Sequence, residues 1–549
     1  MKKVIDFIKE HNYLMILLIF IGFSISLSLT YSNFIVTSNN HKAAEMYIGE
    51  LKYSIEIDGT TTNTLTVPAG ETIIDVKVNN LNPVDTYYKL LYLNNSNLEI
   101  KYFSETKDTD EVKTNYKSPN DSVTSSNTNN LKLFIRNNST TSQNVSFSLK
   151  GGYINNTLSD ISVPSGYSEI TTIEVPSSNT YFCKTDSTLT QGLEYVNGQY
   201  TYGYKKEGYY APSRLAWSYI SNNGWGVQLT DKASTDAVTS KLCTYINNKP
   251  VVSMSYMFLN SQAKALDLSN FDTSKVNNML GMFWSSQATT LDISNFNTSK
   301  VTNMSSMFYN SKATTLDLSS FDTSKVTSMD SMFVNSQVTT LDLSSFDTSS
   351  VTNMSWMFYQ SQATTLDVSN FDTSKVIDMN HMFWNSKATT LDVSNFDTSK
   401  VTNMSYMFSN SKATTLDLSS FDTSSVTNMS YMFFSSKATT LDVSNFDTSK
   451  VTNMRSMFSG SQATTLDVSN FDTSKVTDMS KMFYDSTKLK TIYASNKFNT
   501  DAVTSSIEMF THSTNLVGGS GTTYNSSYTD KTYARIDGGT TNPGYFTSK

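Results

Sequence analysis

The stretch that decides the fold runs Leu291-Asp292-Ile293-Ser294-Asn295-Phe296 and continues with Val301, Met304 and the pair Met307-Phe308. It recurs every 25 residues without an insertion, and a leucine opens each copy. Those leucines are Leu266, Leu291, Leu316, Leu341, Leu366, Leu391, Leu416, Leu441 and Leu466. A fixed period of this length is typical of a solenoid, in which each repeat forms one coil. One coil buries too little apolar surface to offset its backbone entropy, so we expect the copies to fold only as a stack with capped ends.

Each coil combines two apolar patterns. Residues Thr290 to Ser294 alternate polar and apolar, which is the period of a half-buried strand with Leu291 and Ile293 pointing inward. From Val301 onward the apolar residues recur at intervals of three and four, which predicts one face of a short helix. The predicted fold class is therefore an α/β repeat, a leucine-rich-repeat-like solenoid whose 25-residue coils each contain a strand and a short helical segment.

The repeat sequence is almost unchanged from Leu316 to Phe333 and from Leu416 to Phe433. In this form it resembles the BspA-type leucine-rich-repeat surface proteins of bacteria, and the resemblance extends from about residue 225 to residue 549. It implies a leucine-rich-repeat solenoid displayed on a bacterial surface. Members of that family act as adhesins for host extracellular proteins, so the resemblance also implies a binding role.

The first residues predict a membrane anchor. Residues 13–36 carry no charge and are long enough to cross the hydrocarbon core as a helix, and lysines precede them at positions 2, 3 and 9. This arrangement predicts a cytoplasmic stub at residues 1–12, an uncleaved transmembrane signal anchor at residues 13–36 and an exported C-terminal bulk. The expected localisation is the bacterial cell membrane, with a single pass. The alternative is a cleavable signal peptide, for which Ala43-Ala44 is the nearest small-residue site.

The two segments that follow do not repeat. Residues 44–180 alternate in stretches such as Ile74 to Val78 and predict an all-β sandwich with a long loop between Ser104 and Asn130. This domain is either a stalk or a second binding domain. Residues 181–250 lie where the first coil needs a cover and predict an N-terminal capping region. The alternating tyrosines at 200, 202 and 204 leave a tyrosine-rich ligand pocket as the alternative.

The repeats occupy residues 251–485, and residues 486–549 contain a decayed repeat that we expect to cap the C-terminal end. The only two cysteines, Cys183 and Cys243, lie in the N-terminal capping region. A disulfide between them would close a loop of about 60 residues and would stabilise the fold by about 4 kcal/mol on the loop-entropy account. A reducing environment would leave both as thiols.

Composition and motifs exclude several classes of function. The net charge of -7 lacks the basic stripe that nucleic acid requires, so we expect no nucleic-acid partner. The four histidines are scattered, and no metal-ligand spacing, nucleophile elbow or phosphate-binding glycine loop is present. Catalysis needs one unique group of residues, which a repeated sequence does not supply. We therefore expect neither an enzymatic activity nor a cofactor.

Stacking converts each outward position into a column, and the first candidate surface is an acidic column on the strand side. Its members are Asp267, Asp292, Asp317, Asp342, Asp367, Asp392, Asp417, Asp442 and Asp467. Neighbouring carboxylates about 5 Å apart repel by about 1 kcal/mol in water, so the column needs relief. Hydroxyl hydrogen bonds from neighbouring Thr and Ser, a bound cation such as calcium, or a basic partner would each provide it.

The second candidate surface is a set of positions that vary from coil to coil on either side of the Met-Phe pair. The aromatic residues there are Tyr256, Trp284, Tyr309, Trp356, Tyr359, His381, Trp384, Tyr406, Tyr431, Phe434 and Tyr484. Rigid aromatic side chains suit protein hot spots and sugar stacking, so variation toward Trp and Tyr on a constant scaffold indicates ligand contact. The structural alternative is that these rings stack on one another and seal the edge of the solenoid.

These patterns together predict a cell-surface adhesin that binds a host extracellular-matrix protein or a glycan, without covalent chemistry, over the extended face of the solenoid. The alternative is a structural surface protein whose solenoids associate with one another to build a surface layer or to join cells. Regular Thr columns also leave ice binding open, although the acidic column interrupts the hydroxyl array.

Overall fold

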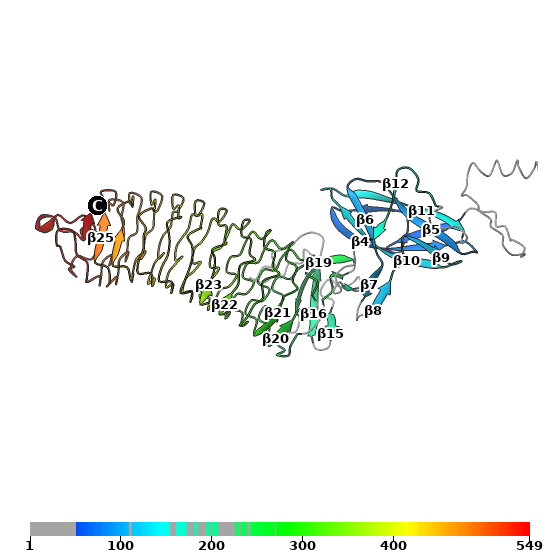
Figure 1. Cartoon of the computed structure of the whole chain (residues 1–549), viewed down its shortest axis with the longest axis horizontal. Coiled ribbons are helices and arrows are strands. Elements are labelled where there is room, and N and C mark those ends of the chain that lie inside the picture. The colour runs from blue at the N-terminus through cyan, green and yellow to red at the C-terminus, as the bar shows by residue number, and fades with distance from the viewer. Residues whose placement is uncertain are drawn as a thin grey trace, which may run out of the picture. The chain divides into compact units, whose positions relative to one another are not determined.

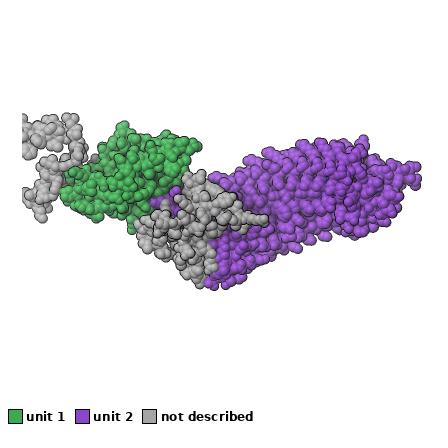
Figure 2. Space-filling model, turned by 180° about the vertical axis from the view of Figure 1, so that it is seen from behind, with its two compact units in different colours: residues 1–178 green, residues 179–549 purple. Residues whose placement is uncertain are grey.

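The computed structural model describes residues 51–549 except for short gaps. The gaps are 109–111, 154–160, 173–180, 184–193, 198–199, 207–224, 230–231, 239–241, 247 and 270. The chain divides into two compact units, Met1–Ser178 and Asn179–Lys549, which Figure 2 colours separately.

Two sheets make up the first unit. The first has the order β13-β6-β10-β4-β1-β2, and the second has the order β12-β5-β11-β3 with β9 paired to β5. The strands of the first sheet are β13 (Thr171–Thr172), β6 (Leu98–Phe103), β10 (Thr128–Asn137), β4 (Gly70–Asn80), β1 (Tyr53–Ile57) and β2 (Thr60–Thr61). Those of the second are β12 (Tyr167–Glu169), β5 (Thr86–Leu93), β11 (Gln143–Tyr153), β3 (Thr64–Val67) and β9 (Asn120–Val123).

The two sheets enclose one apolar core, because alternate residues of a strand point to the same face of its sheet. On β4 the residues that belong to this core are Ile74, Val76 and Val78, and β10 places Leu133 opposite Ile74 and Leu131 opposite Val76. Residues of β5 and β11 from the second sheet belong to the same core. This is the arrangement of a β-sandwich.

The polar stretch between Ser104 and Asn130 is not the long loop that its composition predicted. It contains an antiparallel hairpin formed by β7 (Glu105–Asp108) and β8 (Val112–Asn115), and it also contains β9, which pairs with β5. Backbone groups alone supply the hydrogen bonds of a strand pair, so a low apolar content does not exclude one.

The second unit begins with strands in the order β15-β16-β17-β19-β18-β14. They are β15 (Glu194–Asn197), β16 (Tyr200–Lys206), β17 (Trp225–Leu229), β19 (Lys249–Ser253), β18 (Tyr245–Ile246) and β14 (Tyr181–Cys183). The indole N–H of buried Trp225 donates to the carbonyl of Ile246 at 2.7 Å. Leu229 is buried in the core of the repeats, and its N–H donates to the carbonyl of Met257 at 2.9 Å. This sheet therefore continues directly into the first coils.

Both cysteines lie in this sheet region. Cys243 is buried and disulfide-bonded. Cys183, the other cysteine of the chain, lies on β14, which pairs in parallel with β18. The tyrosines of β16 have side chains outside the described residues, so the tyrosine-rich pocket stays a prediction.

The repeats form a solenoid of stacked coils (Figure 1). Ten parallel bridges connect one position of each coil to the next, from Ser253 to Ser505. On another side of the coil, short strands pair in parallel, and their register sets Leu266 opposite Leu291. These pairs are β20 (Ala265–Asp267) with β21 (Thr290–Asp292), β22 (Thr340–Leu341) with β23 (Thr365–Leu366), and β24 (Thr465–Asp467) with β25 (Thr491–Ala494). Equivalent residues of successive coils therefore form columns.

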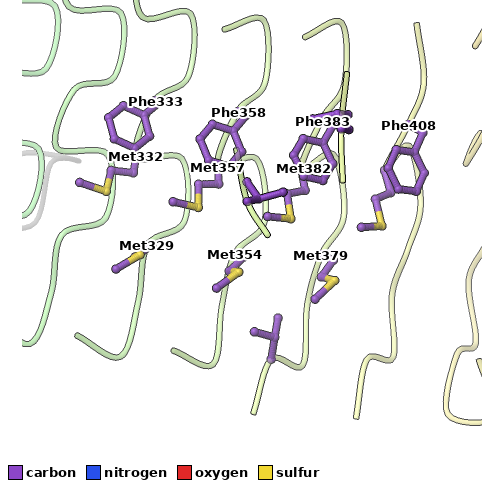
Figure 3. Packing of buried hydrophobic residues seen from close by; sticks show 14 of the residues in the cluster. Met329, Met332, Phe333, Met354, Met357, Phe358, Met379, Met382, Phe383 and Phe408 are labelled. Atoms are coloured by element: carbon purple, nitrogen blue, oxygen red, sulfur yellow. The ribbon is translucent and has the colours of Figure 1, made fainter. Parts of the chain in front are cut away.

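The core of the solenoid consists of such columns, and Figure 3 shows those of methionine and phenylalanine. The Phe column that follows the second Met runs from Phe258 to Phe510, and neighbouring rings stack with centroids 5.4–5.8 Å apart. Met354, Met357 and Phe358 have no exposed surface, and the same holds for their equivalents in the neighbouring coils. Each layer therefore covers the next, as stacking requires.

The predicted helical segment is not present, and the α/β fold class is wrong. In the coil that starts at Leu291, Met304 donates to the carbonyl of Ser328 in the next coil at 3.2 Å, and Phe308 donates to Met332 at 2.9 Å. Between these two, Met307 donates back to Met304, so the segment is a series of turns. Helix axes pack 8–10 Å apart, whereas the stacked Phe rings set the coils less than 6 Å apart, which leaves no room for a helix in each coil.

The described part of the second unit is nearly all β in consequence. The helical elements among the described residues are two short 3₁₀ turns, η2 (Lys531–Tyr533) and η3 (Gly539–Thr541). The fold is a β-solenoid whose coils are joined by backbone hydrogen bonds, and it differs from a leucine-rich repeat, which carries a helical side.

The prediction of a single-pass membrane protein also needs correction. Among the residues that the structure describes, no helix has the length and apolar character needed to cross a bilayer. The segment predicted to span the membrane, residues 13–36, lies outside the described residues. The described residues therefore do not support the predicted membrane localisation.

The C-terminal end of the solenoid is covered by the last residues of the chain. The strand β26 (Phe546–Ser548) adds in parallel to β25. Phe546 and Tyr545 are buried and pack edge-on against Phe510, the last ring of the Phe column, at 6.1 and 5.1 Å. Buried Asp537 accepts hydrogen bonds from Thr522, Ser520 and Gly539 and ties the terminal turns together.

Candidate functional site

Every coil contains two left-handed backbone positions that lie four residues apart, just around the Met-Phe pair. In one coil they are Trp356 and Gln360, with φ of 62° and 53°. The second position carries residues that tolerate this conformation, and asparagine is the most frequent among them. Those asparagines are Asn260, Asn310, Asn335, Asn385 and Asn410. The first position carries Tyr256, Trp356, His381, Tyr406 and Tyr431 in five of the coils.

The first left-handed position does not require a ring. A left-handed conformation costs roughly 1–2 kcal/mol for a residue with a β-carbon, and a bulky aromatic residue is an uncommon occupant. Ser306, Ser331 and Ser456 occupy the same position in other coils, with φ of 56°, 59° and 53°. The coil therefore folds with a small residue there, and the rings in the other coils are not explained by backbone geometry.

Three residues after the first left-handed position lies a second variable column. It carries Trp284, Tyr309, Tyr359, Trp384, Phe434 and Tyr484, and other coils carry Val334, Ser409 and Ser459. One coil has serine in both columns, at Ser456 and Ser459. This coil stacks with the same inter-coil hydrogen bonds as the others, since Ser456 donates to Ser480 at 2.9 Å.

Seven of the predicted residues form one continuous group, which we call the aromatic strip. It consists of Trp356, Tyr359, His381, Trp384, Tyr406, Tyr431 and Phe434. The rings at the left-handed positions are parallel, with centroid distances of 3.8 Å from Trp356 to His381 and 4.4 Å from His381 to Tyr406. The stack continues from Tyr406 to Tyr431 at 4.4 Å. All seven side chains are half-buried.

The second column of rings lies alongside this stack. Trp384 contacts Tyr359 at 4.8 Å and Tyr406 at 4.9 Å, and Phe434 contacts Tyr431 at 5.7 Å. The faces of the four stacked rings therefore cover one another, and this column presents mainly ring edges, whereas the rings of the second column are tilted against their neighbours.

The remaining predicted residues lie outside the strip. Tyr256, Trp284 and Tyr309 form a smaller group, with ring distances of 6.0 and 4.4 Å. Tyr256 lies over Gly281, where a β-carbon would approach its ring to 2.5 Å, so a larger residue there would displace the ring. Tyr484 contacts His512 at 5.5 Å. The single predicted set thus splits into three groups, because residues without rings, such as Ser331, Val334, Ser456 and Ser459, interrupt the columns between them.

The strip is electrically neutral near pH 7. Burial lowers the pKa of His381 to about 4, so the imidazole between Trp356 and Tyr406 carries no charge. Its Nδ1 lies 2.5 Å from the side-chain oxygen of Asn380. Within the described part of the chain, no hydrogen bond is formed by the indole N–H groups of Trp356 and Trp384.

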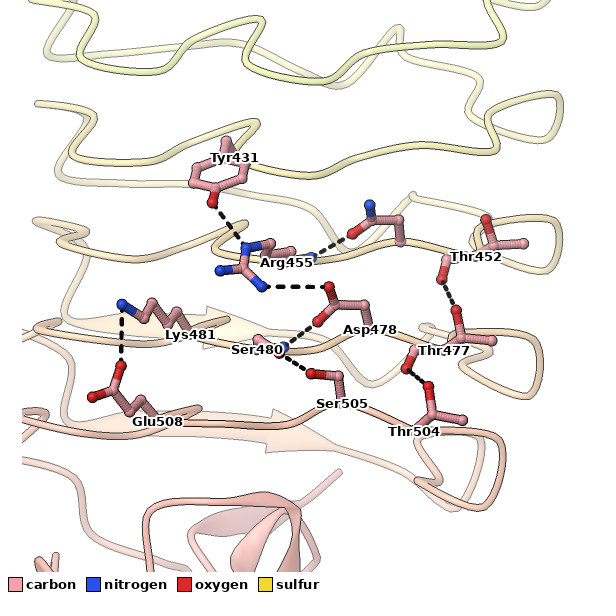
Figure 4. Close-up of polar contacts among 11 residues, drawn as sticks. Tyr431, Thr452, Arg455, Thr477, Asp478, Ser480, Lys481, Thr504, Ser505 and Glu508 are labelled. Carbon is pink, nitrogen blue, oxygen red and sulfur yellow. Dashed lines mark hydrogen bonds and ion pairs between the residues drawn. The ribbon is translucent and has the colours of Figure 1, made fainter.

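Arg455 closes the C-terminal end of the strip (Figure 4). Its Nε donates to the hydroxyl of Tyr431 at 2.9 Å, and its guanidinium lies 3.6 Å from the carboxylate of Asp478. One coil further on, Lys481 pairs with Glu508 at 3.1 Å. The sequence analysis did not predict Arg455 as a site residue. The other coils mostly carry serine at its position, so Arg455 also differs from the constant scaffold.

The acidic column lies on the strand side, away from these contacts. Asp367 accepts hydrogen bonds from the hydroxyl of Ser369 at 2.6 Å and from its N–H at 2.9 Å, and these bonds lower the pKa of Asp367. The other aspartates of the column accept from the serine two residues later in the same way. A second acidic column with the same hydrogen bonds was missed, and it includes Asp322, Asp347, Asp372, Asp397, Asp422, Asp447 and Asp472.

Hydroxyl and amide donors thus bind the carboxylates of the acidic column, and Lys549 also pairs with Asp467. In the residues that the structure describes, no three His, Cys, Asp or Glu side chains are grouped in a way that would hold a metal ion. A shallow open groove of about 390 Å³ lies along this side and is lined by Thr390, Leu391, Asp392, Thr415, Leu416, Asp417 and Thr440.

The fold and the columns define the chain as a β-solenoid repeat protein. Three overlapping segments, residues 232–344, 327–441 and 410–520, match the family described as Mycoplasma protein of unknown function, DUF285. These matches cover more than half of the chain, so it belongs to this family. A search of the curated proteins gave no significant match, and neither did a search of the solved structures. The resemblance to BspA-type proteins stays a prediction beside this result.

Proposed function

We propose that this protein is an adhesin that binds a host extracellular-matrix protein or a glycan, without covalent chemistry, through the aromatic strip. The observation that carries the proposal is the placement of Trp356, His381, Tyr406 and Tyr431 at strained backbone positions. Strain of this kind clusters at ligand-binding sites in proteins. The same chain places serine at that position in other coils, which argues against a purely structural need for the rings.

The scaffold supports this role in two ways. Backbone hydrogen bonds between coils hold the strip on a rigid surface, which lowers the entropy cost of binding. The strip extends over the coils that carry Trp356, His381, Tyr406 and Tyr431, so it suits an elongated ligand.

The test is a triple variant, Trp356→Ser, Tyr359→Ser and Trp384→Ser, in the full chain. Binding to immobilised matrix proteins and to a glycan array is measured beside far-UV circular dichroism and thermal unfolding. Because hot-spot residues each contribute 2 kcal/mol or more, we expect the triple variant to lose at least about a hundredfold in affinity and to keep its secondary structure.

The control changes the strand side of three coils that carry the strip, with Asp367→Asn, Asp392→Asn and Asp417→Asn. We expect this control to bind as the unmodified protein does. Retained binding by the serine variant, with loss by the control, would move the site to the strand side. Concentration-dependent light scattering that disappears in the serine variant would instead favour self-association through the strip.

A further inference from the structure

The chemistry of the aromatic strip selects among the ligands of an adhesin. This inference rests on the proposed function and concerns the same site. A polypeptide partner usually inserts an aromatic or arginine anchor into a desolvated pocket. The strip offers no open ring face along most of its length, because His381, Tyr406 and Tyr431 are covered by stacked neighbours. What it exposes is a row of ring edges.

Those edges carry hydrogen-bond donors. The indole N–H groups of Trp356 and Trp384 have no partner within the described residues, and neither does the hydroxyl of Tyr359. Side-chain amides stand beside the strip, since Gln360 and Asn385 are half-buried at the second left-handed position. A row of unpaired donors and amides complements a ligand that is dense in oxygen acceptors and hydroxyls.

Trp356 is the first ring of the stack. It stacks on His381, and the equivalent position one coil earlier is Ser331, which has no ring. Tyr359 contacts Trp356 edge-on at 4.9 Å, so the face of Trp356 turned away from His381 has no stacked ring from its own column. The flat C–H face of a pyranose packs well on an indole face, so this end provides a platform for a single sugar unit.

The charges near the strip are already neutralised. The seven side chains are uncharged near pH 7, because the only ionisable one at that pH, His381, is neutral there. The nearest cation, Arg455, is occupied by Tyr431 and Asp478. An acidic ligand would find no free positive charge in the strip.

We infer that the ligand of the aromatic strip is a neutral, hydroxyl-rich glycan, with one sugar on the face of Trp356 turned away from His381 and the following sugars along the ring edges toward Tyr431. The donors of Trp356, Tyr359 and Trp384 bind its oxygen atoms.

The experiment measures affinities of the full chain for neutral oligosaccharides, for acidic oligosaccharides and for enzymatically deglycosylated matrix proteins. The informative variant is the double change Trp356→Phe and Trp384→Phe, which keeps two rings and removes two N–H donors. Trp284→Phe is the matched control, because it makes the same change in the second column outside the strip.

We expect neutral oligosaccharides to bind, with affinity reduced about tenfold in the double variant and unchanged in the control, since each lost hydrogen bond is modest in water. Binding should not change with ionic strength. Strip-dependent binding to deglycosylated proteins alone would overturn the glycan inference and leave the proposed function standing. Selective, salt-dependent binding of acidic glycans would overturn the neutral assignment. The absence of binding to all three classes would refute the proposed function itself.

Discussion

The two sides of a coil are joined to their neighbours in different ways. On the side of the Met-Phe pair, alternate N–H groups donate to the next coil, and rings such as Phe383 and Phe408 stack at 5.7 Å. On the strand side, the parallel pairs between described residues join β20 to β21, β22 to β23 and β24 to β25, but no such pair joins Leu391 to Leu416. The turns therefore join successive coils more regularly than the strands do.

The distance between rings in a second Phe column also differs from that at the Met-Phe pair. Phe396 and Phe421 lie nearer the strand side, and their rings are 6.4 Å apart. The shallow groove lined by Thr390 and Asp417 opens on that side. The coils thus lie closest at the Met-Phe pair. Substitutions there should therefore lower the free energy of unfolding the most.

The largest effect is expected from Phe383→Ala. Phe383 has no exposed surface and stacks between Phe358 and Phe408, so its truncation should leave a cavity and cost about 3–5 kcal/mol. Leu391→Ala on the strand side of the next coil should cost nearer 2 kcal/mol, because Leu391 is already 5% exposed beside the groove. Urea unfolding followed by tryptophan fluorescence reports on the second unit, which holds all five tryptophans. Equal costs at the two positions would contradict the comparison.

A buried hydroxyl column gives the next effect. The hydroxyl of Thr398 has no exposed surface and donates to the carbonyl of Asp422 in the next coil at 2.8 Å. Thr398→Val keeps the shape and leaves that carbonyl without its donor, so we expect a loss of about 1–3 kcal/mol in the same unfolding measurement. Thr402→Val is the control, because Thr402 is exposed and its contact to Ile377 is long, at 3.4 Å. A control as costly as Thr398→Val would refute the role of the buried bond.

The left-handed positions provide a third test on the Met-Phe side. Asn385 has a φ of 53°, so Asn385→Ala should cost about 1–2 kcal/mol, whereas Asn385→Gly should cost almost nothing. The unfolding midpoints of the two variants, measured side by side, check this order. If alanine were tolerated as well as glycine, the turn geometry described for the coils would be in error.

The smallest expected effect is a pH dependence that separates the two sides. The pKa of His381 in the folded protein is about 4, below its value of about 6.5 in an unfolded chain. Its contribution to stability is therefore complete above pH 6.5 and is lost as the pH falls toward 4. The pKa of Asp367 is lowered by its hydrogen bonds to Ser369, so its contribution is lost only below about pH 4.

Unfolding midpoints between pH 7 and pH 3 distinguish the two contributions. His381→Gln should flatten the curve between pH 6.5 and pH 4 and leave the acid limb unchanged. Asp367→Asn should flatten the curve below about pH 4 and leave the part between pH 6.5 and pH 4 unchanged. A His381→Gln curve that coincides with that of the unmodified protein would show that the imidazole is not buried in the stack.

The sequence predicts the stacking period and the inward residues well, and it fails at the local conformation between them. The apolar positions that it marks, such as Val301, Met304 and Phe308, are fully buried. Their spacing of three and four fits a helix, but it fits a row of turns equally well. The recurring asparagine after Met-Phe, as in Asn310 and Asn335, was the available sign of a left-handed turn.

For the candidate site, the sequence indicates which residues vary but not how they group. Tyr256 and Tyr484 belong to the same pattern as Trp356, yet the structure separates them from the strip, because stacking needs aromatic residues in adjacent coils. Arg455 lies in the pattern but has no aromatic ring, so a search for rings passed over it. Neither the ring contacts of Trp356 nor the neutral state of His381 is visible without coordinates.

The most direct test of the central claim, that the strip serves a ligand and not the fold, is the urea unfolding of one variant. It carries Trp356→Ser, His381→Ser, Tyr406→Ser and Tyr431→Ser, which gives four coils the residue that Ser456 already provides. We predict one cooperative transition with native far-UV circular dichroism and a loss of about 1–2 kcal/mol per ring, since the stacking contacts are lost while the left-handed backbone is kept, as it is at Ser456. A variant without a cooperative transition would contradict the claim and make the strip a structural seal.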